Sequence, residues 1–256
     1  MKQYKKMIKI IILIIILLFL VGMIYIYDQN ENKVAILGYH SILPKEINTS
    51  GDNLVVDMEK FEKDIKLLKN LGYDTMTLDE FYCWKKGECD KKHKSVLITF
   101  DDGYQNNYDY AFEILKKYDM NAVVFSVGIL IESNNSIHMN LDTIKKTKSE
   151  YPNIEFASHS YDLHFHSDKT YEMVNDDIKK MKTIIDSEYY AYPYGDYNKE
   201  YRQALEDNNY KMAFTFGPSK EHRKADIKDN DYTIPRLNIS NDMSIIKFIL
   251  RLILPM

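Results

Sequence analysis

The chain has 256 residues, of which 45% are hydrophobic and 28% are charged, so it has room for one large α/β domain or two small ones. Its formal net charge is −4, and residues 1–27 contain four lysines and no acidic residue, which leaves −8 for residues 28–256. Such an acidic region argues against nucleic acid as a partner, because lysine and arginine are what bind the phosphate backbone.

Residues 1–27 have the pattern of a membrane segment. Lysines precede an unbroken apolar run over residues 10–27, roughly 18 residues, which is near the minimum for crossing a bilayer. The basic flank predicts a cytoplasmic N-terminus. A cleaved signal peptide is the alternative, but neither a small-x-small cleavage site nor a lipobox cysteine follows the run. We therefore expect an uncleaved transmembrane signal anchor, a short tether over residues 28–33, and an extracytoplasmic domain over residues 34–256.

Residues 34–100 predict the first part of an alternating α/β chain. The apolar run 34–39 reads as a buried strand that ends at His40. A helix starting at Asp57 follows and ends at Gly72. Residues 73–76 and 78–85 predict a short strand and a short helix. Residues 95–100 are apolar and β-branched, which is typical of a buried parallel strand, and they lead directly into Asp101-Asp102-Gly103.

The remaining chain continues the alternation. Predicted helices cover residues 108–117, 141–150, 170–186 and 199–207, and predicted strands cover residues 122–127, 154–158, 189–192, 212–216 and 232–237. Alternation of this kind predicts a parallel sheet with right-handed crossovers. With seven or eight β/α units, we expect an irregular barrel rather than an open sheet. The apolar tail 244–256 is too short to span a membrane, and we expect it to pack on the barrel as a last helix; the alternative is a helix lying on the bilayer surface.

Residues that can take part in catalysis or metal binding lie at the ends of five of the predicted strands. They are His40, Asp101-Asp102, His159, Pro193-Tyr194-Gly195 and Arg236. In a β/α barrel the carboxyl ends of all strands meet on one face, so these side chains should converge. Two adjacent carboxylates repel each other when ionised, and a nearby cation or a shared proton relieves this. A simple Asp-Gly turn is the alternative for the pair alone.

Two histidines indicate a metal site. His159 and His164 are five residues apart and would point away from each other on a helix, but a loop should follow the strand that ends before His159. Two neutral imidazoles and a carboxylate such as Asp102 form a three-ligand site with open positions, as in catalytic rather than structural metal sites. His166 ranks below His164 as a ligand.

At this point the chain resembles a known family. Residues 99–103, Thr-Phe-Asp-Asp-Gly, are similar to the first motif of the polysaccharide deacetylases, also called the NodB homology domain or carbohydrate esterase family 4. The His159–His164 spacing is one residue longer than in that family's usual second motif, as in the branch of the poly-β-1,6-N-acetylglucosamine deacetylases. Residues 37–40 and 191–195 also resemble that branch. The resemblance covers roughly residues 34–240.

The resemblance implies a fold and a role for each site residue. The fold would be a NodB-like barrel, and Asp102, His159 and His164 would bind a divalent metal, with zinc as the first choice. Asp101 would be the general base, and His40 the general acid that protonates the departing amine. The backbone N–H of Tyr194 would help to hold the oxyanion. The third motif usually carries an arginine that pairs with the base; here Ala191 or Tyr192 stands in its place, and either Arg236 substitutes or it forms a structural salt bridge.

We therefore expect a membrane-anchored, metal-dependent hydrolase that removes N-acetyl groups from an N-acetylglucosamine-containing polysaccharide outside the cell, with a poly-N-acetylglucosamine exopolysaccharide as the first substrate choice. The alternatives are a peptidoglycan N-acetylglucosamine deacetylase and a non-catalytic glycan-binding protein. Cys83 and Cys89 either form a local disulfide or remain free thiols.

Overall fold

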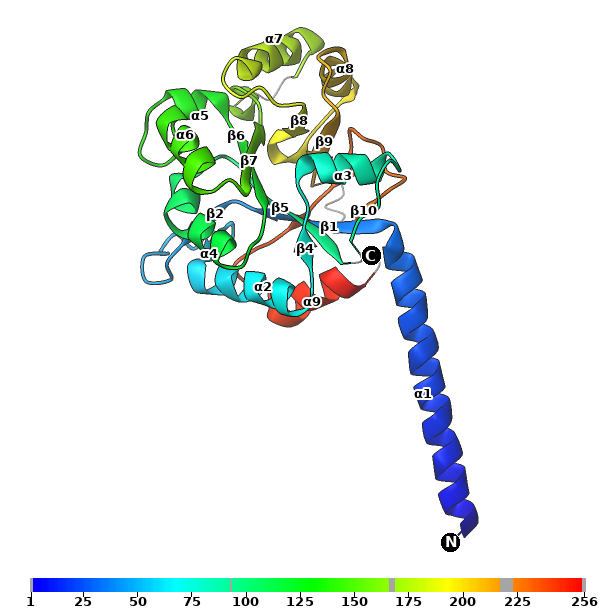
Figure 1. The fold of residues 1–256 in the computed structure, drawn as a ribbon. Coiled ribbons are helices and arrows are strands. Elements are labelled where there is room, and N and C mark those ends of the chain that lie inside the picture. Colours follow the sequence, from blue (N-terminus) through cyan, green and yellow to red (C-terminus); the bar gives the residue numbers. More distant parts are fainter. Residues whose placement is uncertain (1, 93, 166–168, 217–222, 255–256) are drawn as a thin grey trace.

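The structure is a computed structural model that describes residues 2–92, 94–165, 169–216 and 223–254. Helix α1 (Lys2–Glu31) projects away from a single α/β domain (Figure 1). Its length and apolar composition are sufficient to cross a membrane, and none of its most apolar stretch is buried in the protein; a signal sequence has the same properties. The helix continues through Asp28 to Glu31, and the first strand begins at Lys33.

The sheet is a nearly closed, mainly parallel barrel. Its consecutive parallel strands are β1 (Lys33–Tyr39), β5 (Ser95–Phe100), β6 (Ala122–Ser126), β7 (Ile154–Ser158), β8 (Tyr189–Ala191) and β9 (Met212–Thr215). The barrel closes through one segment, in which β11 (Ile234–Pro235) pairs with β9 and β12 (Leu237–Asn238) pairs with β1. The predicted barrel is therefore confirmed, although the last predicted strand is replaced by two short strands on either side of Arg236.

Four further strands depart from this plan. β4 (Asp74–Thr75) adds to β5, and β10 (Ala225–Asp226) pairs with β1 in the antiparallel direction. β2 (Ser41–Leu43) and β3 (Val55–Asp57) form a separate two-stranded sheet. Apart from β4, these strands were not predicted, because segments of two or three residues are too short for a readable alternation of apolar and polar residues.

Helices cover the outside of the barrel (Figure 1). They are α2 (Met58–Asn70), α3 (Leu78–Lys85), α4 (Phe112–Lys117), α5 (Gly128–Glu132), α6 (Leu141–Glu150), α7 (Tyr171–Lys182), α8 (Lys199–Asp207) and α9 (Ile245–Ile253). A π-helical turn, η1 (Asn107–Ala111), precedes α4, and 3-10 turns occur at η2 (Leu163–Phe165) and η3 (Pro193–Gly195). The predicted bounds of α3, α6 and α8 are confirmed, whereas α7 ends four residues before its predicted end at residue 186.

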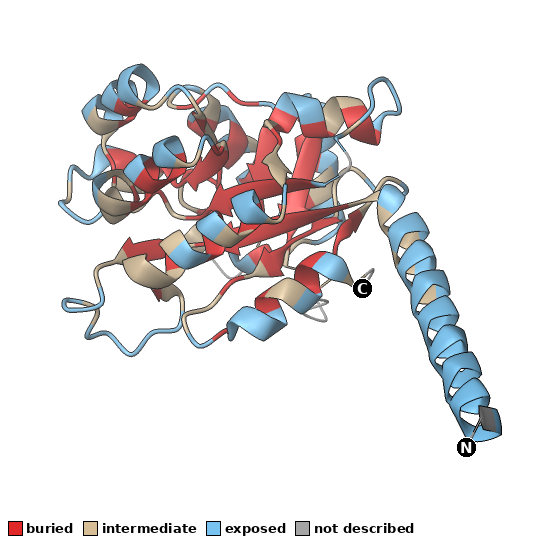
Figure 2. Cartoon of the chain, turned by 60° about the horizontal axis from the view of Figure 1, so that its bottom comes forward, coloured by how far each residue is buried: buried red, intermediate tan, exposed pale blue. Residues whose placement is uncertain are grey.

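Alternate residues of the strands pack on opposite sides of the sheet. In β1, Ala35, Leu37 and Tyr39 join the cluster that faces α2, whereas Val34 and Ile36 join the cluster that includes α3. This period of two is the normal geometry of a strand, and burial on both sides explains the continuous apolar runs. Figure 2 shows the result, with buried strands inside and an exposed α1.

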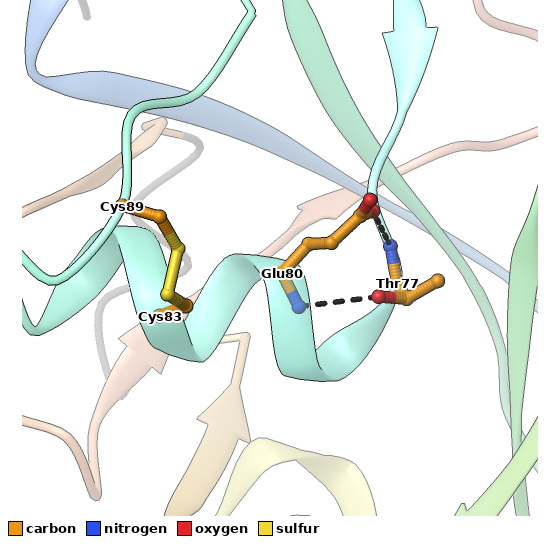
Figure 3. The surroundings of a disulfide bond; sticks show 4 residues. All are labelled: Thr77, Glu80, Cys83 and Cys89. Carbon is orange, nitrogen blue, oxygen red and sulfur yellow. Dashed lines mark hydrogen bonds between the residues drawn. A yellow bond between two sulfur atoms is a disulfide. The ribbon is translucent and has the colours of Figure 1, made fainter.

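Local contacts fix the start of α3, and apolar contacts hold α9 on the domain. The Thr77 hydroxyl accepts a hydrogen bond from the backbone N–H of Glu80, and the Glu80 carboxylate accepts one from the N–H of Thr77, which is a capping box at the start of α3 (Figure 3). Cys83 in the same helix forms a disulfide with Cys89. The C-terminal helix α9 packs on the domain through Phe248 and Leu252, as predicted.

Candidate active site

Tight turns at the strand ends bring the acidic pair into the site. The backbone N–H of Asp101 donates to the carbonyl of Tyr39 (3.0 Å), which extends the β1–β5 pairing by one residue. The chain then turns sharply, with φ of 67° at Asp102 and 74° at Gly103. A side chain at position 103 would be strained in this conformation, and its Cβ would lie 3.0 Å from the hydroxyl of Ser126. Glycine is therefore required where the two carboxylates leave the strand.

The three predicted ligands converge on one point. One ligand atom each from Asp102, His159 and His164 lies within 4.8 Å of the other two. Asp102 Oδ1 is 3.7 Å from Nε2 of His159 and 3.3 Å from Nε2 of His164. Atoms at these separations can share one cation, because ligand-to-metal distances of about 2.0–2.2 Å place neighbouring ligand atoms about 3–3.5 Å apart. His166, the lower-ranked candidate, lies outside the described residues.

The protonation states of the two imidazoles suit a metal. Nδ1 of His159 lies 2.7 Å from the carbonyl oxygen of Ala191, which only accepts, so Nδ1 carries the proton and the lone pair of Nε2 is left to bind a cation shared with Asp102. Burial lowers the pKa of His159 to about 3 and that of His164 to about 4. Both rings are therefore neutral near pH 7, which is the form that binds metal.

The Asp102 carboxylate is unfavourable without a cation. Burial, and then repulsion from Asp101, raise the pKa of Asp102 to about 7, although a hydrogen bond from Tyr104 opposes the shift. A divalent cation between Asp102 and the two imidazoles would favour the ionised carboxylate. Two neutral nitrogens, one carboxylate oxygen and a site near the surface fit a zinc-type ion with open coordination positions.

Asp101 has a different environment from its neighbour. Arg236 binds it in a bidentate manner, with Nη1 2.6 Å from Oδ1 and Nη2 2.8 Å from Oδ2. The guanidinium group is completely buried and lies 4.1 Å from the ring centroid of Phe216. Burial opposes ionisation of Asp101, but the charge of Arg236 outweighs it and holds the pKa of Asp101 well below its usual range. Asp101 is therefore ionised across the neutral range.

His40 and Tyr194 complete the set of predicted residues. His40 Nε2 lies 3.9 Å from Asp101 Oδ2, on the same rim as the metal ligands, and burial lowers the pKa of His40. Tyr194 has φ of 58°, and its ring, which is 68% exposed, lies 4.8 Å from the ring of His164. Gly195 permits this turn, because a Cβ there would lie 2.6 Å from the backbone nitrogen of Phe216.

Two supporting residues were not predicted. Asp177 in α7 accepts hydrogen bonds from the backbone N–H groups of Tyr161 (2.8 Å), Asp162 (2.8 Å) and Leu163 (3.2 Å), and so holds the loop between the two histidine ligands. Asn107 donates to the carbonyl of His40 (2.7 Å). Neither residue lies at a strand end or in a motif, so only the burial of these polar side chains could have indicated their roles.

Comparison with known proteins identifies the family. The chain is 33% identical to the poly-β-1,6-N-acetyl-D-glucosamine N-deacetylase of Staphylococcus epidermidis over 240 residues, which is 83% of this chain and 81% of that protein. The chain belongs to the polysaccharide deacetylase family. The polysaccharide deacetylase model matches residues 88–213, and a putative polysaccharide deacetylase of Bacillus subtilis, YxkH, is 31% identical over 226 residues, covering 86% of this chain and 76% of that protein.

Solved structures agree with this assignment. The Streptococcus pyogenes deacetylase PplD, solved in complex with acetate, superposes with a TM-score of 0.74 at 25% identity and covers 86% of this chain and 98% of that one. IcaB from Ammonifex degensii has the same fold, with a TM-score of 0.70 at 20% identity and coverage of 85% and 94%. The polysaccharide deacetylase assignment and the NodB-like barrel predicted from the motifs are therefore confirmed.

Proposed function

We propose that this polysaccharide deacetylase is a metal-dependent hydrolase that removes N-acetyl groups from N-acetylglucosamine residues in an extracellular glycan of the poly-β-1,6-N-acetylglucosamine type. The observation that carries the proposal is the convergence of Asp102, His159 and His164 beside the Arg236-paired Asp101. The glycan class is supported by the relatives that bear this name and match most of the chain. The exposed ring of Tyr194 beside His164 gives a sugar an aromatic surface to pack on.

The reaction adds water across the amide bond, which forms a C–O bond, breaks the C–N bond and yields acetate and a free amine. A divalent cation at the three-ligand site would polarise the acetyl carbonyl and lower the pKa of water. Asp101 takes the proton of the attacking water, and Arg236 keeps this carboxylate ionised and fixed in position. The N–H of Tyr194 stabilises the negative charge that develops on the acetyl oxygen.

His40 provides the second proton transfer. Its Nε2 is close to Asp101, so both groups can face the same amide. The lowered pKa of His40 makes its protonated form a stronger acid, which can donate to the leaving nitrogen. The Asp101 carboxylate acts in the opposite direction and favours the protonated form.

We also propose that α1 is an uncleaved single-pass anchor with its N-terminus in the cytoplasm and the barrel outside. Support comes from the lysines that precede the apolar stretch and from the Cys83–Cys89 disulfide, a bond typical of oxidising compartments. The active site would then lie on the side of the membrane where exported glycans are found.

Acetate release from two purified polymers tests the function. We expect the full chain, in detergent and loaded with zinc, to release acetate from poly-β-1,6-N-acetylglucosamine at a rate at least about tenfold above that from peptidoglycan, a difference of about 1.4 kcal/mol in transition-state stabilisation. Preference for peptidoglycan would overturn the proposed substrate, and binding of either polymer without acetate release would overturn the proposed chemistry.

A further inference from the structure

Helix α9 has an apolar face that the domain leaves uncovered. Phe248 and Leu252 pack into the core, and Arg251 donates to the carbonyl of Asn238 (2.7 Å). The other side of the helix is exposed and apolar apart from Lys247. Its exposed apolar residues are Ile245 (46% exposed), Ile246 (67%), Leu250 (45%) and Ile253 (39%). Figure 2 brings this side of the domain forward and shows the exposed segments of α9.

The C-terminal end of α9 is fixed to the end of α1. The side-chain amide of Asn30 in α1 donates to the carbonyl of Ile253 (2.8 Å). Lys224 joins both helices, because its ammonium group donates to the Asn30 side chain and to the carbonyl of Leu252. A cavity of about 600 Å³ beside these contacts is lined by both helices, including Ile26 and Tyr27 of α1.

Helix α2 places positive charge beside the apolar face. It lies next to α9 on this side of the domain (Figure 1), and the ammonium group of Lys60 lies 6.0 Å from the ring centroid of Phe248. Lys247 is exposed on α9 itself, whereas Lys63 and Lys66 of α2 line a groove with Lys117 and Tyr118. Exposed isoleucines with a lysine at their edge match a surface that is apolar inside and anionic at its edge, as a phospholipid bilayer is.

We propose that α9 lies in the plane of the bilayer interface, with Ile245, Ile246, Leu250 and Ile253 among the lipid chains and Lys247 at the headgroups. The inference rests on the anchor proposed for α1. An α1 that crosses the bilayer emerges near Asn30, and the hydrogen bond from Asn30 to Ile253 places the C-terminal end of α9 beside this exit. An amphipathic helix in this position buries its apolar face about 5–10 Å into the interface.

The arrangement orients the active site. Helix α1 leads into the amino end of β1, whereas the metal ligands follow the carboxyl ends of the strands. A seven-residue strand spans roughly 20 Å. Figure 1 shows β1 running across the direction of α1 rather than along it, so with α9 on the membrane the site lies at the end of the barrel remote from α1.

Depth-dependent quenching tests this proposal in the full chain. Single cysteines are introduced by Ile246→Cys in α9, Leu18→Cys in α1 and Ile137→Cys, labelled with an environment-sensitive fluorophore, and reconstituted in phosphatidylglycerol-containing vesicles with nitroxide-labelled lipid. Ile137 is the matched control, since it is an isoleucine that is 60% exposed in a loop on the catalytic side. We expect lipid nitroxide to reduce emission about twofold or more at positions 18 and 246 and to leave position 137 unchanged.

Each other outcome has a distinct meaning. Quenching at position 18, with position 246 behaving like position 137, would overturn the inference for α9 and leave the anchor intact. Quenching at position 246 alone would show that α9 binds lipid without a membrane-spanning α1, and would overturn the anchored arrangement proposed here. A blue shift at position 246 without lipid quenching would show that a second copy of the chain covers α9, and would also overturn the proposal.

Discussion

Replacing Asp101 by asparagine is expected to lower the rate of acetate release by about 10²–10⁴-fold, which is the range that a positioned general base contributes. The amide is nearly isosteric with the carboxylate and can still accept a hydrogen bond from Arg236, but it cannot take a proton from water. Asp101 is not one of the three converging ligand residues, so the variant should still bind one equivalent of zinc.

The matched control for this variant is Asp142→Asn, because Asp142 is highly exposed at the start of α6 and belongs to no described site. Zinc content and melting temperature, measured beside kcat, separate loss of chemistry from loss of structure. Asp101→Asn with full zinc content and unchanged kcat would show that Asp101 is not the base.

Replacing Arg236 by methionine is expected to destabilise the fold by about 3–5 kcal/mol, because it leaves a buried carboxylate without its partner. Arg236 and Asp101 are both almost completely buried, and the two hydrogen bonds between them are short. Methionine retains a similar volume between Phe125 and Phe216, so the main change is the loss of charge and hydrogen bonds rather than a cavity.

The effect of Arg236→Met should depend on pH. In the parent protein the pKa of folded Asp101 is depressed, so its contribution to stability is present above the unfolded pKa, about 4, and is lost as pH falls through the folded pKa. In the variant, burial without Arg236 raises this pKa, so acid protonates Asp101 and relieves the destabilisation. The difference in unfolding free energy should therefore be largest near pH 7 and narrow toward pH 4.

Activity provides a second readout for the same variant. Because the pKa of Asp101 is raised in the variant, Asp101 becomes protonated at a higher pH. The acid limb of the pH profile of kcat should therefore shift to higher pH. Arg236→Lys, which keeps the charge but not the bidentate geometry, should shift this limb less. Arg236 would be shown to form a purely structural contact if Arg236→Met left the acid limb of the kcat profile at the same pH and lowered the unfolding free energy equally at all pH values.

The main features of the fold were predictable because strong local patterns encode them. Continuous apolar runs located the buried parallel strands, and Asp57 and Gly72 bounded the first helix after β1. Since parallel strands end on one face of a barrel, the strand-end positions of Asp102 and His159 were enough to predict that these residues would meet. The spacing to His164 required only a loop after β7.

The rest depends on contacts that no local pattern encodes. Arg236 is 135 residues from its partner Asp101, so only the closure of the barrel through β11 and β12 reveals the bidentate pair. Asp177 looks like an ordinary helical surface residue until the fold places it under the loop that precedes His164. The antiparallel pairing of β10 with β1 is likewise a tertiary contact that the short local sequence does not predict.

The most direct test is the location of a metal ion in crystals of the protein grown with zinc, by anomalous scattering at the zinc edge. We expect one fully occupied peak about 2.0–2.2 Å from Nε2 of His159, Nε2 of His164 and a carboxylate oxygen of Asp102. Chelation should remove this peak and acetate release together, and both should return when zinc is restored. Full acetate release from protein without the peak, or a peak bound by other residues, would contradict the assignment of this site.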